Sequence, residues 1–214
     1  MQARKTAKEK HPIVKVKRDW RDYVAECLLI VFSVILALVL TEFIDNLNDK
    51  KKTAEVLHEL KDELIDNKKN EEEQYAYHLQ VIKNIDSALH NPGFAKKFIN
   101  DSGEIDLEHT IAPYGVMSHD LNDVAWQIAK QNNIVSKIDI STYSLLNDIY
   151  NNQARITNSE DKIGQILLSY ESRKPENLRT TLILFSESYR AWDVDRAPKL
   201  IENYQKAIDI LNKY

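Results

Sequence analysis

The apolar residues of this chain follow one pattern near the N-terminus and another beyond it. Segment 23–44 reads YVAECLLIVFSVILALVLTEFI, and it contains no charged residue between Cys27 and Thr41. A helix that packs on a soluble core keeps one polar face, whereas this segment is apolar around its whole circumference. It reaches the length of about 20 residues that crosses a bilayer if Glu26 and Glu42 lie at the two headgroup layers. The pattern therefore predicts one transmembrane helix, and the lipid bilayer is the first expected partner.

A buried hairpin helix and a cleaved signal peptide are the alternatives for this segment. No small-x-small cleavage pattern follows Leu40, so we expect the segment to remain attached as a signal anchor. Residues 1–22 carry eight basic and three acidic side chains, a net charge of +5, which leaves −9 of the total of −4 to the rest of the chain. The positive-inside rule then predicts a cytoplasmic N-terminus. In a Gram-negative bacterium the protein would be a single-pass inner-membrane protein with a periplasmic C-terminal domain.

Beyond the predicted span the spacing of apolar residues becomes helical. Residues 45–90 contain no Gly or Pro, and Leu57, Leu60 and Leu64 recur at helical intervals. We expect the transmembrane helix to continue through this region as a stalk that becomes the first helix of a bundle. Within it, segment 66–74 (DNKKNEEEQ) shows no apolar stripe. It is either a solvated part of the helix or a break between two helices.

The remaining residues, 91–214, are predicted to complete the bundle. Asn91-Pro92-Gly93 ends the long helix, and residues 94–118 read mainly as loop. Further helices are expected from Ser118 to Ala129, from Asp139 to Ser172, from Pro175 to Trp192, and from Pro198 to Leu211. In the second of these regions, 139–172, the residues expected to face inward are Tyr143, Leu146, Ile149, Tyr150, Ile156, Ile163, Ile166, Leu167 and Tyr170. The predicted fold is all-α, with an antiparallel bundle of four or five helices on a membrane stalk.

Three small or hydroxylated residues form a candidate packing surface within the span. Ser33, Ala37 and Thr41 recur at i, i+4 and i+8, so they share one face of the helix. Small residues let membrane helices approach closely, which favours a homo-oligomer. Ordinary variation on a lipid-facing surface explains the same stripe, and both interpretations stay open.

Aromatic residues beyond the span give a second candidate site. Trp126, Tyr150 and Trp192 would line a pocket if the bundle binds a small molecule between its helices. The alternative is that they are core residues whose polar tips reach the surface, and this is the favoured interpretation.

The sequence offers no arrangement of residues that selects a catalytic chemistry. His119 and Asp123 stand at i, i+4 and are conceivable metal ligands, but a capped, solvated helix start explains both, and we favour that alternative. No phosphate-binding loop, dinucleotide fingerprint or nucleophile elbow occurs. We therefore expect no metal, no cofactor and no enzymatic activity. The acidic exported part also disfavours nucleic acid as a partner.

Two loose motifs resemble bacterial single-span membrane proteins that are known only as domains of unknown function. The first is a Glu before an apolar span with Ala-Leu and an Asn-Trp-Asn-Glu-like exit, matched here by Glu26, Ala37-Leu38 and 46–49, with Leu47 in place of the Trp. The second is a Trp-x-x-Ala helix, an acidic-aromatic turn and a Tyr-x-x-Gln helix end, matched at 126–129, 139–143 and 150–153. The resemblance implies a membrane-anchored helical architecture and supplies no catalytic residue.

The functional expectation is a membrane-anchored extracytoplasmic helical interaction or scaffold protein. It would associate with itself or with another protein of the cell envelope. The second hypothesis is a ligand-sensing bundle that acts through a partner chain, because a cytoplasmic tail of about 22 residues is too short for an output domain. The third is a hydrolase or metal enzyme whose ligands are scattered in sequence.

Overall fold

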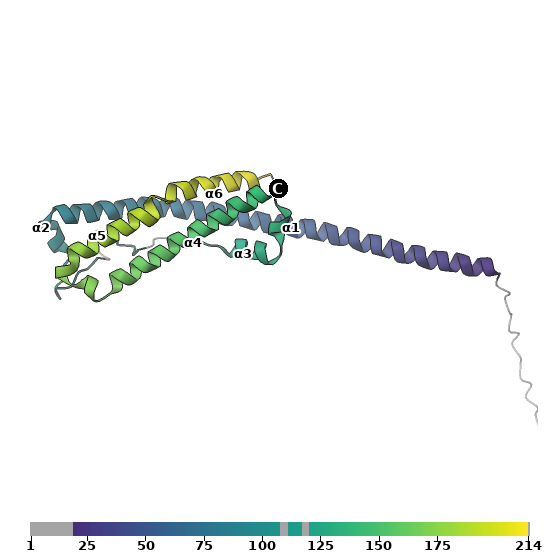
Figure 1. Ribbon diagram of the computed structural model, residues 1–214, viewed down its shortest axis with the longest axis horizontal. Helices are drawn as coiled ribbons and strands as arrows, with labels where there is room; N and C mark the ends of the chain where they lie inside the picture. The colour runs from purple at the N-terminus through teal and green to yellow at the C-terminus, as the bar shows by residue number, and fades with distance from the viewer. Residues whose placement is uncertain (1–18, 108–110, 117–119, 214) are drawn as a thin grey trace, which may run out of the picture. The chain divides into compact units, whose positions relative to one another are not determined.

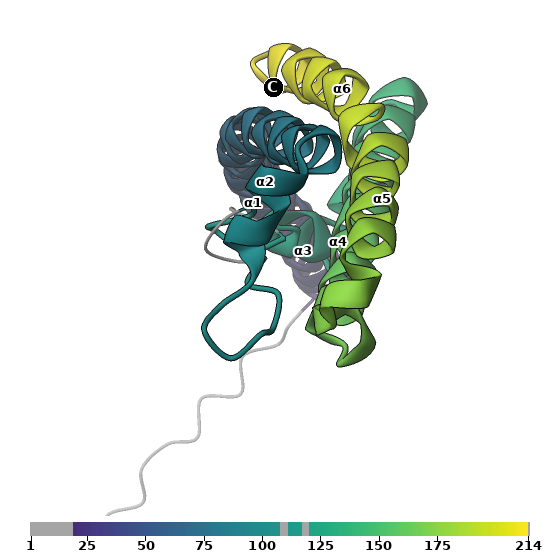
Figure 2. The ribbon, with the colours of Figure 1, turned by 90° about the vertical axis from the view of Figure 1, so that its left-hand side faces the viewer.

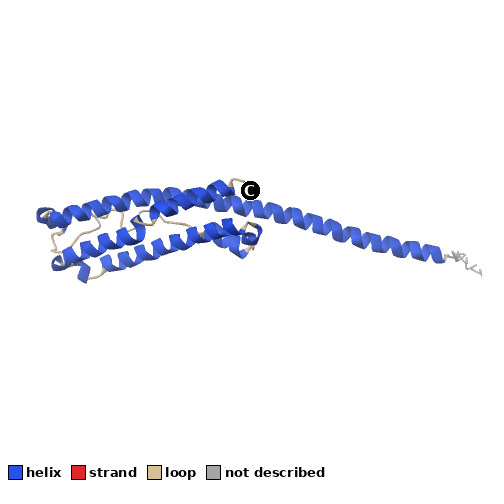
Figure 3. Ribbon diagram, turned by 45° about the horizontal axis from the view of Figure 1, so that its top comes forward, coloured by secondary structure: helices blue, strands red, loops and turns tan. Residues whose placement is uncertain are grey.

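The structure is a computed structural model in which residues 19–107, 111–116 and 120–213 are described, except for the side chains of residues 192 and 193. Within these ranges the regular secondary structure is helical, and the β-type pairing consists of one isolated bridge between Ile99 and Ile105. Figure 3 shows helices joined by short loops and by one longer irregular connection. The all-α prediction is confirmed.

The chain divides into two units, residues 1–50 and 51–214, and each is described separately. In the first unit, residues 20–50 belong to helix α1 (Trp20–His90), and every one of them is exposed. The most apolar stretch of α1 has a mean hydropathy of 2.8, and 0% of it is buried. A helix of this length and composition could cross a membrane. Residues 1–18, which form most of the predicted basic tail, lie outside the described residues.

The second unit contains the rest of α1 and five further α-helices (Figure 1). These are α2 (Pro92–Ala95), α3 (Val124–Gln131), α4 (Ile140–Leu168), α5 (Leu178–Tyr189) and α6 (Ala197–Leu211). The 3-10 turns are Lys96–Phe98, Ile134–Lys137, Glu171–Arg173 and Pro175–Asn177, and a π-helical turn, Arg190–Val194, precedes α6.

Two of the predicted helix boundaries coincide with side-chain caps, whereas α4 ends at Leu168 rather than at Ser172. Asn91 accepts hydrogen bonds from the backbone N–H groups of Gly93 and Phe94, so α1 stops and α2 starts at the predicted Asn-Pro-Gly signal. Asp139 accepts the N–H groups of Ser141 and Thr142 and caps α4 as expected. The α3 prediction was wrong at its start: the helix begins at Val124 rather than near Ser118.

Hydrogen bonds between side chains show how α4 is aligned with α1. Three pairs connect the two helices: Glu63 with Tyr150, Asn67 with Gln153, and Gln74 with Glu160. From one pair to the next the residue numbers increase in both helices, so α1 and α4 run parallel. The sequence predicted an antiparallel arrangement, and for these two helices that prediction was wrong. The irregular connection is the segment 99–123 between the 3-10 turn that follows α2 and the start of α3. It brings the chain back alongside α1 to the part of this unit where α1 begins.

Helices α5 and α6 run in the opposite direction to α1. Arg190, in the π-helical turn before α6, pairs with Asp86 at 2.9 Å. Tyr204 lies further along the chain, in α6, and donates a hydrogen bond to Gln153. Figure 2 looks along the helices and shows α4, α5 and α6 arranged beside α1, with α3 among them.

The apolar core of the second unit consists of two clusters. The first contains Leu60 and Leu64 of α1 together with residues of α3, α4 and α6, and the second contains Val81 and Ile85 of α1 together with residues of α5 and the irregular connection. Of the predicted inward residues of 139–172, Leu146, Ile149, Tyr150, Ile156 and Ile163 are buried. Tyr143, Ile166 and Tyr170 are 37%, 43% and 74% exposed, so that part of the prediction was wrong.

Candidate functional site

A row of polar side chains lies buried on α1 between the two apolar clusters. Its members, called the polar row below, are Glu63, Asn67, Glu71, Gln74 and His78, and none is more than 9% exposed. Segment 66–74 is therefore neither a break nor a fully solvated helix, because one of its faces is buried. Ten of the twelve buried residues of α1 follow one another at intervals of three and four: Leu57, Leu60, Leu64, Asn67, Glu71, Gln74, His78, Val81, Ile85 and Ala88; the other two, Glu63 and Ile82, lie beside Leu64 and Val81. The polar row continues the spacing of the apolar stripe and differs only in chemistry.

Glu63 caps a helix other than its own. Its Oε2 accepts the backbone N–H of Ala125 at 2.7 Å, and its Oε1 accepts that of Trp126 at 3.4 Å, at the start of α3. Asp123, the residue before α3, makes no capping hydrogen bond with its side chain. A carboxylate at a helix N-terminus satisfies unpaired N–H groups and interacts favourably with the helix dipole. Tyr150 donates to the same carboxylate at 2.6 Å, and burial together with this bond raises the pKa of Tyr150.

Asn67 holds the chain segment that precedes α3. Its side-chain amide donates to the Asn122 carbonyl at 2.6 Å and accepts the Asn122 N–H at 2.8 Å, as a neighbouring β-strand would. Gln153 of α4 also donates to the Asn122 carbonyl, and Tyr204 of α6 donates to the Gln153 side chain at 2.9 Å. These bonds occupy the backbone of Asn122 and explain why α3 starts only at Val124.

The third group of contacts joins His78, Glu160 and the carbonyl of Val116. Gln74 donates to Glu160 Oε1, and His78 Nε2 lies 3.6 Å from the same oxygen and 3.1 Å from the Val116 carbonyl. The ring of Tyr189 stacks on His78 at 4.2 Å, and its hydroxyl donates to the Val116 carbonyl. Burial lowers the pKa of His78 to about 4, so the ring is neutral at pH 7.

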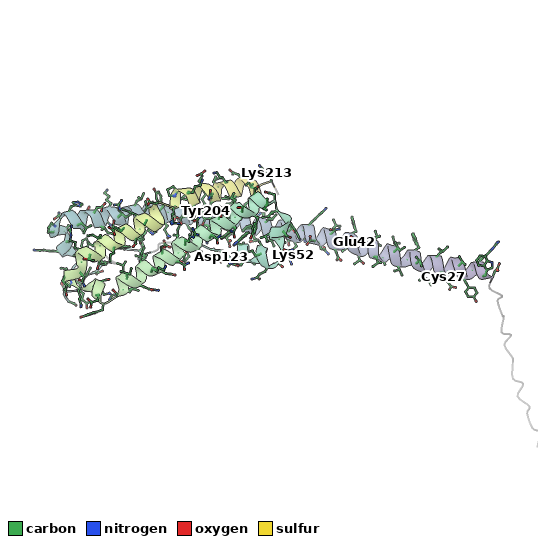
Figure 4. The ribbon with its side chains drawn as sticks, in the orientation of Figure 1. Cys27, Glu42, Lys52, Asp123, Tyr204 and Lys213 are labelled. Atoms are coloured by element: carbon green, nitrogen blue, oxygen red, sulfur yellow. The ribbon has the colours of Figure 1, made fainter. Side chains whose placement is uncertain are left out.

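Glu71 is the member of the polar row whose bonding is incomplete. It is 2% exposed, and its Oε2 has no hydrogen-bond partner among the described residues. Burial raises the pKa of Glu71 to about 7, so a substantial fraction of these side chains is protonated at neutral pH. Burial also raises the pKa of Tyr204, whose ionisation is further opposed by the charges of Glu71 and Glu63. Figure 4 labels Tyr204 on α6.

Two of the three aromatic residues that were candidates for a pocket come together in the bundle. Trp126 and Tyr150 do come together, but their rings stack at 5.2 Å with an interplanar angle of 2° within the first apolar cluster. Both side chains are buried in that cluster, which agrees with the favoured interpretation of them as core residues. The side chain of Trp192 lies outside the described residues.

The structure does not test the remaining candidate residues from the sequence. In the apolar segment, Ser33 and Thr41 donate their hydroxyls to the carbonyls of Leu29 and Ala37, which satisfies both groups within the helix. Their packing against a partner remains a prediction. His119 lies outside the described residues, and so does its pairing with Asp123. Among the described residues there is no group of three or more potential metal ligands.

Comparison of the chain with protein-family models, with curated proteins and with solved structures gives no match.

The raised pKa of Glu71 predicts that a neutral side chain at this position increases the stability of the protein, and that the increase is larger at high pH. Because the pKa of Glu71 in the folded state lies above the ordinary glutamate value of 4.5, this side chain favours folding fully below pH 4.5, and that contribution is lost as the pH rises through about 7. Glu71→Gln should therefore stabilise the protein above pH 7 by about 3 kcal/mol more than at pH 4. The measurement is urea unfolding of the full-length chain in detergent at both pH values. The wild-type protein is measured at the same two pH values, because titration of His78 changes the stability of both proteins and cancels in their difference.

Glu72→Gln is the matched control, because Glu72 is exposed and pairs with Lys68 on the outer face of α1. It should change stability by less than about 0.5 kcal/mol at either pH. A Glu71→Gln advantage that does not grow with pH would mean that the buried carboxylate is ionised at little cost.

Removal of the Asn67 side chain should destabilise the protein by about 2–3 kcal/mol. Asn67→Ala removes the acceptor of the Asn122 N–H in a partly buried contact, removes the bonds of the Asn67 amide, and opens a small cavity where the buried side chain lay. Asn70→Ala is the control, because Asn70 donates to the Asp120 carbonyl at 3.0 Å in an exposed contact to the same segment. It should cost under about 1 kcal/mol. Equal losses in the two variants would show that burial of Asn67 does not matter for holding this segment.

Proposed function

We propose that this protein is a single-pass membrane protein whose residues 51–214 form a helical bundle that acts outside the cytoplasm as a non-catalytic interaction or scaffold domain. The observation that carries the proposal is helix α1, which contributes an uncharged, fully exposed stretch to the first unit and the polar row to the second. A stretch of this apolarity needs a partner or a lipid phase to cover it. The +5 charge of residues 1–22 supports a cytoplasmic N-terminus in a bacterial inner membrane.

The hydrogen bonding of the bundle supports a scaffold rather than a reactive site. Glu63, Asn67 and Gln74 each bond to other segments of the chain, and these contacts hold the bundle in one arrangement. A rigid domain of this kind suits the presentation of a constant surface to a partner. The motifs at Glu26, Ala37-Leu38 and 126–129 support kinship with single-span proteins of unknown function, as a proposal.

Ligand sensing is the second candidate, and a specific cavity favours it. A cavity of about 310 Å³ lies between the irregular connection and the C-terminal half of α4, with apolar walls that include Leu107 and Leu167. This volume is at the lower end of the range for small-molecule sites. Its lining does not include Trp126 or Tyr150, which were candidates for a pocket in the sequence.

The orientation is tested with single-cysteine variants of the full chain, since Cys27 is the one native cysteine. In a Cys27→Ser background, Ser102→Cys places a thiol at an exposed loop position of the second unit, and Lys8→Cys places one in the basic tail. A membrane-impermeant maleimide should label the Ser102→Cys variant in intact cells. The Lys8→Cys variant should react only after the inner membrane is permeabilised. The reverse pattern would invert the proposed orientation, and release of the protein by alkaline carbonate would contradict the anchor.

Self-association through the apolar segment is tested at Ala37. Ala37→Phe places a bulky ring in the Ser33–Thr41 stripe and should weaken the association about tenfold or more, because close approach of two helices needs a small residue. Val39→Phe is the control, since it lies about 200° around the helix from Ala37. Mass by light scattering in detergent and crosslinking in native membranes are the measurements. A monomer in all three proteins would leave a different envelope protein as the partner.

A further inference from the structure

We propose that the groove between the irregular connection and the C-terminal half of α4 binds a small amphipathic amine. The inference rests on the second candidate function and names the chemical class of its ligand. The apolar part of such a molecule would lie on Leu107, Val116 and Leu167, and its ammonium group would face the acidic side chains along the rim.

Two adjoining cavities form this groove. The first, of about 310 Å³, and the second, of about 460 Å³, share Val116, Gly164 and Leu168 in their walls. Together they provide a continuous apolar floor flanked by charged side chains. Such a combination suits a ligand with an apolar body and one polar end, because apolar contact supplies affinity and the charged group sets orientation.

The charged groups of the lining favour a cation. Glu104 and Asp106 line the first cavity, Glu160 and Asp161 line the second, and Arg173 is the one cationic side chain among the described lining residues. Glu160 is buried and bonded to Gln74, so Glu104, Asp106 and Asp161 against one guanidinium produce the negative potential that attracts an ammonium group and repels a carboxylate. The exposure of Asp161 and Arg173 keeps each single contribution modest.

The wall of the second cavity is held in place by the polar row. Glu160 is 2% exposed and accepts a hydrogen bond from Gln74, and the Val116 carbonyl lies 3.1 Å from His78 Nε2. Gly115, whose φ of 79° lies in the left-handed region, turns the chain before Val116, and its carbonyl accepts the Tyr77 hydroxyl at 2.6 Å. The walls are thus positioned before any ligand arrives, which lowers the entropic cost of binding.

Gly164 keeps the groove open. A Cβ added there would lie 3.8 Å from Val116 Cγ2, an ordinary contact, so alanine fits without displacing its neighbour. A longer side chain at the same position would extend into the space that both cavities share. The pair Gly164→Ala and Gly164→Leu therefore separates a tolerated substitution from one that fills the groove.

The test uses the full-length protein in nanodiscs and three probes of matched shape: 2-phenylethylamine, 3-phenylpropionate and 2-phenylethanol. Binding is measured by calorimetry, with protein-free nanodiscs as the blank. We expect the amine to bind about tenfold more tightly than either of the other probes. Gly164→Leu should abolish the binding, and Gly164→Ala should retain it within about threefold. Helical circular dichroism and thermal unfolding verify that each variant is folded.

Asp161→Lys provides a second variant that is independent of groove filling, because Asp161 is exposed and its replacement should leave the fold intact. It should weaken amine binding by about fivefold or more and strengthen carboxylate binding. Equal binding of amine and alcohol in wild type would overturn the amine class while the ligand-binding function stands. Preference for the carboxylate would also overturn the proposal, and absence of binding by all three probes would remove the site together with the second candidate function.

Discussion

Two hydrogen-bonded pairs seven residues apart align α1 with α4, and much of the second unit depends on that alignment. Asn67 meets Gln153 and Gln74 meets Glu160, each pair separated by 86 residues in sequence. A shift of α4 by one heptad would bring Leu146 level with Asn67 in one direction, or Leu167 level with Gln74 in the other. A buried polar group without a partner costs about 1–3 kcal/mol, so the polar row disfavours every alignment except this one.

The same side chains also organise a part of the chain that has little regular structure. Asn67 binds the backbone of Asn122, Glu63 caps α3, and His78 lies against the Val116 carbonyl. The irregular connection thereby gains hydrogen bonds from α1 in addition to those within itself. This arrangement needs no disulfide, since Cys27 is the one cysteine and it lies in the first unit. Packing and polar contacts alone hold residues 51–214 together.

The polar row has an energetic cost that the rest of the core offsets. Glu71 is protonated more readily than an ordinary glutamate and His78 less readily, because burial disfavours the charged form of each. Their contributions to stability change in opposite directions with pH and tend to cancel between about pH 4 and 7. The two apolar clusters on either side supply the burial that stabilises the fold around this polar layer.

The sequence by itself determined the features that depend on neighbouring residues. The absence of charge from Cys27 to Thr41, the end of α1 at His90 and the start of α4 at Asp139 all follow from local composition and capping chemistry, whereas the continuity of α1 through 66–74 did not. Only the tertiary structure decided that Asn67 and Glu71 are buried, that α4 runs parallel to α1, and that α3 starts at Val124. Those outcomes depend on partners far away in sequence, and a polar residue at a helical interval has the same local pattern whether water or another helix lies opposite it.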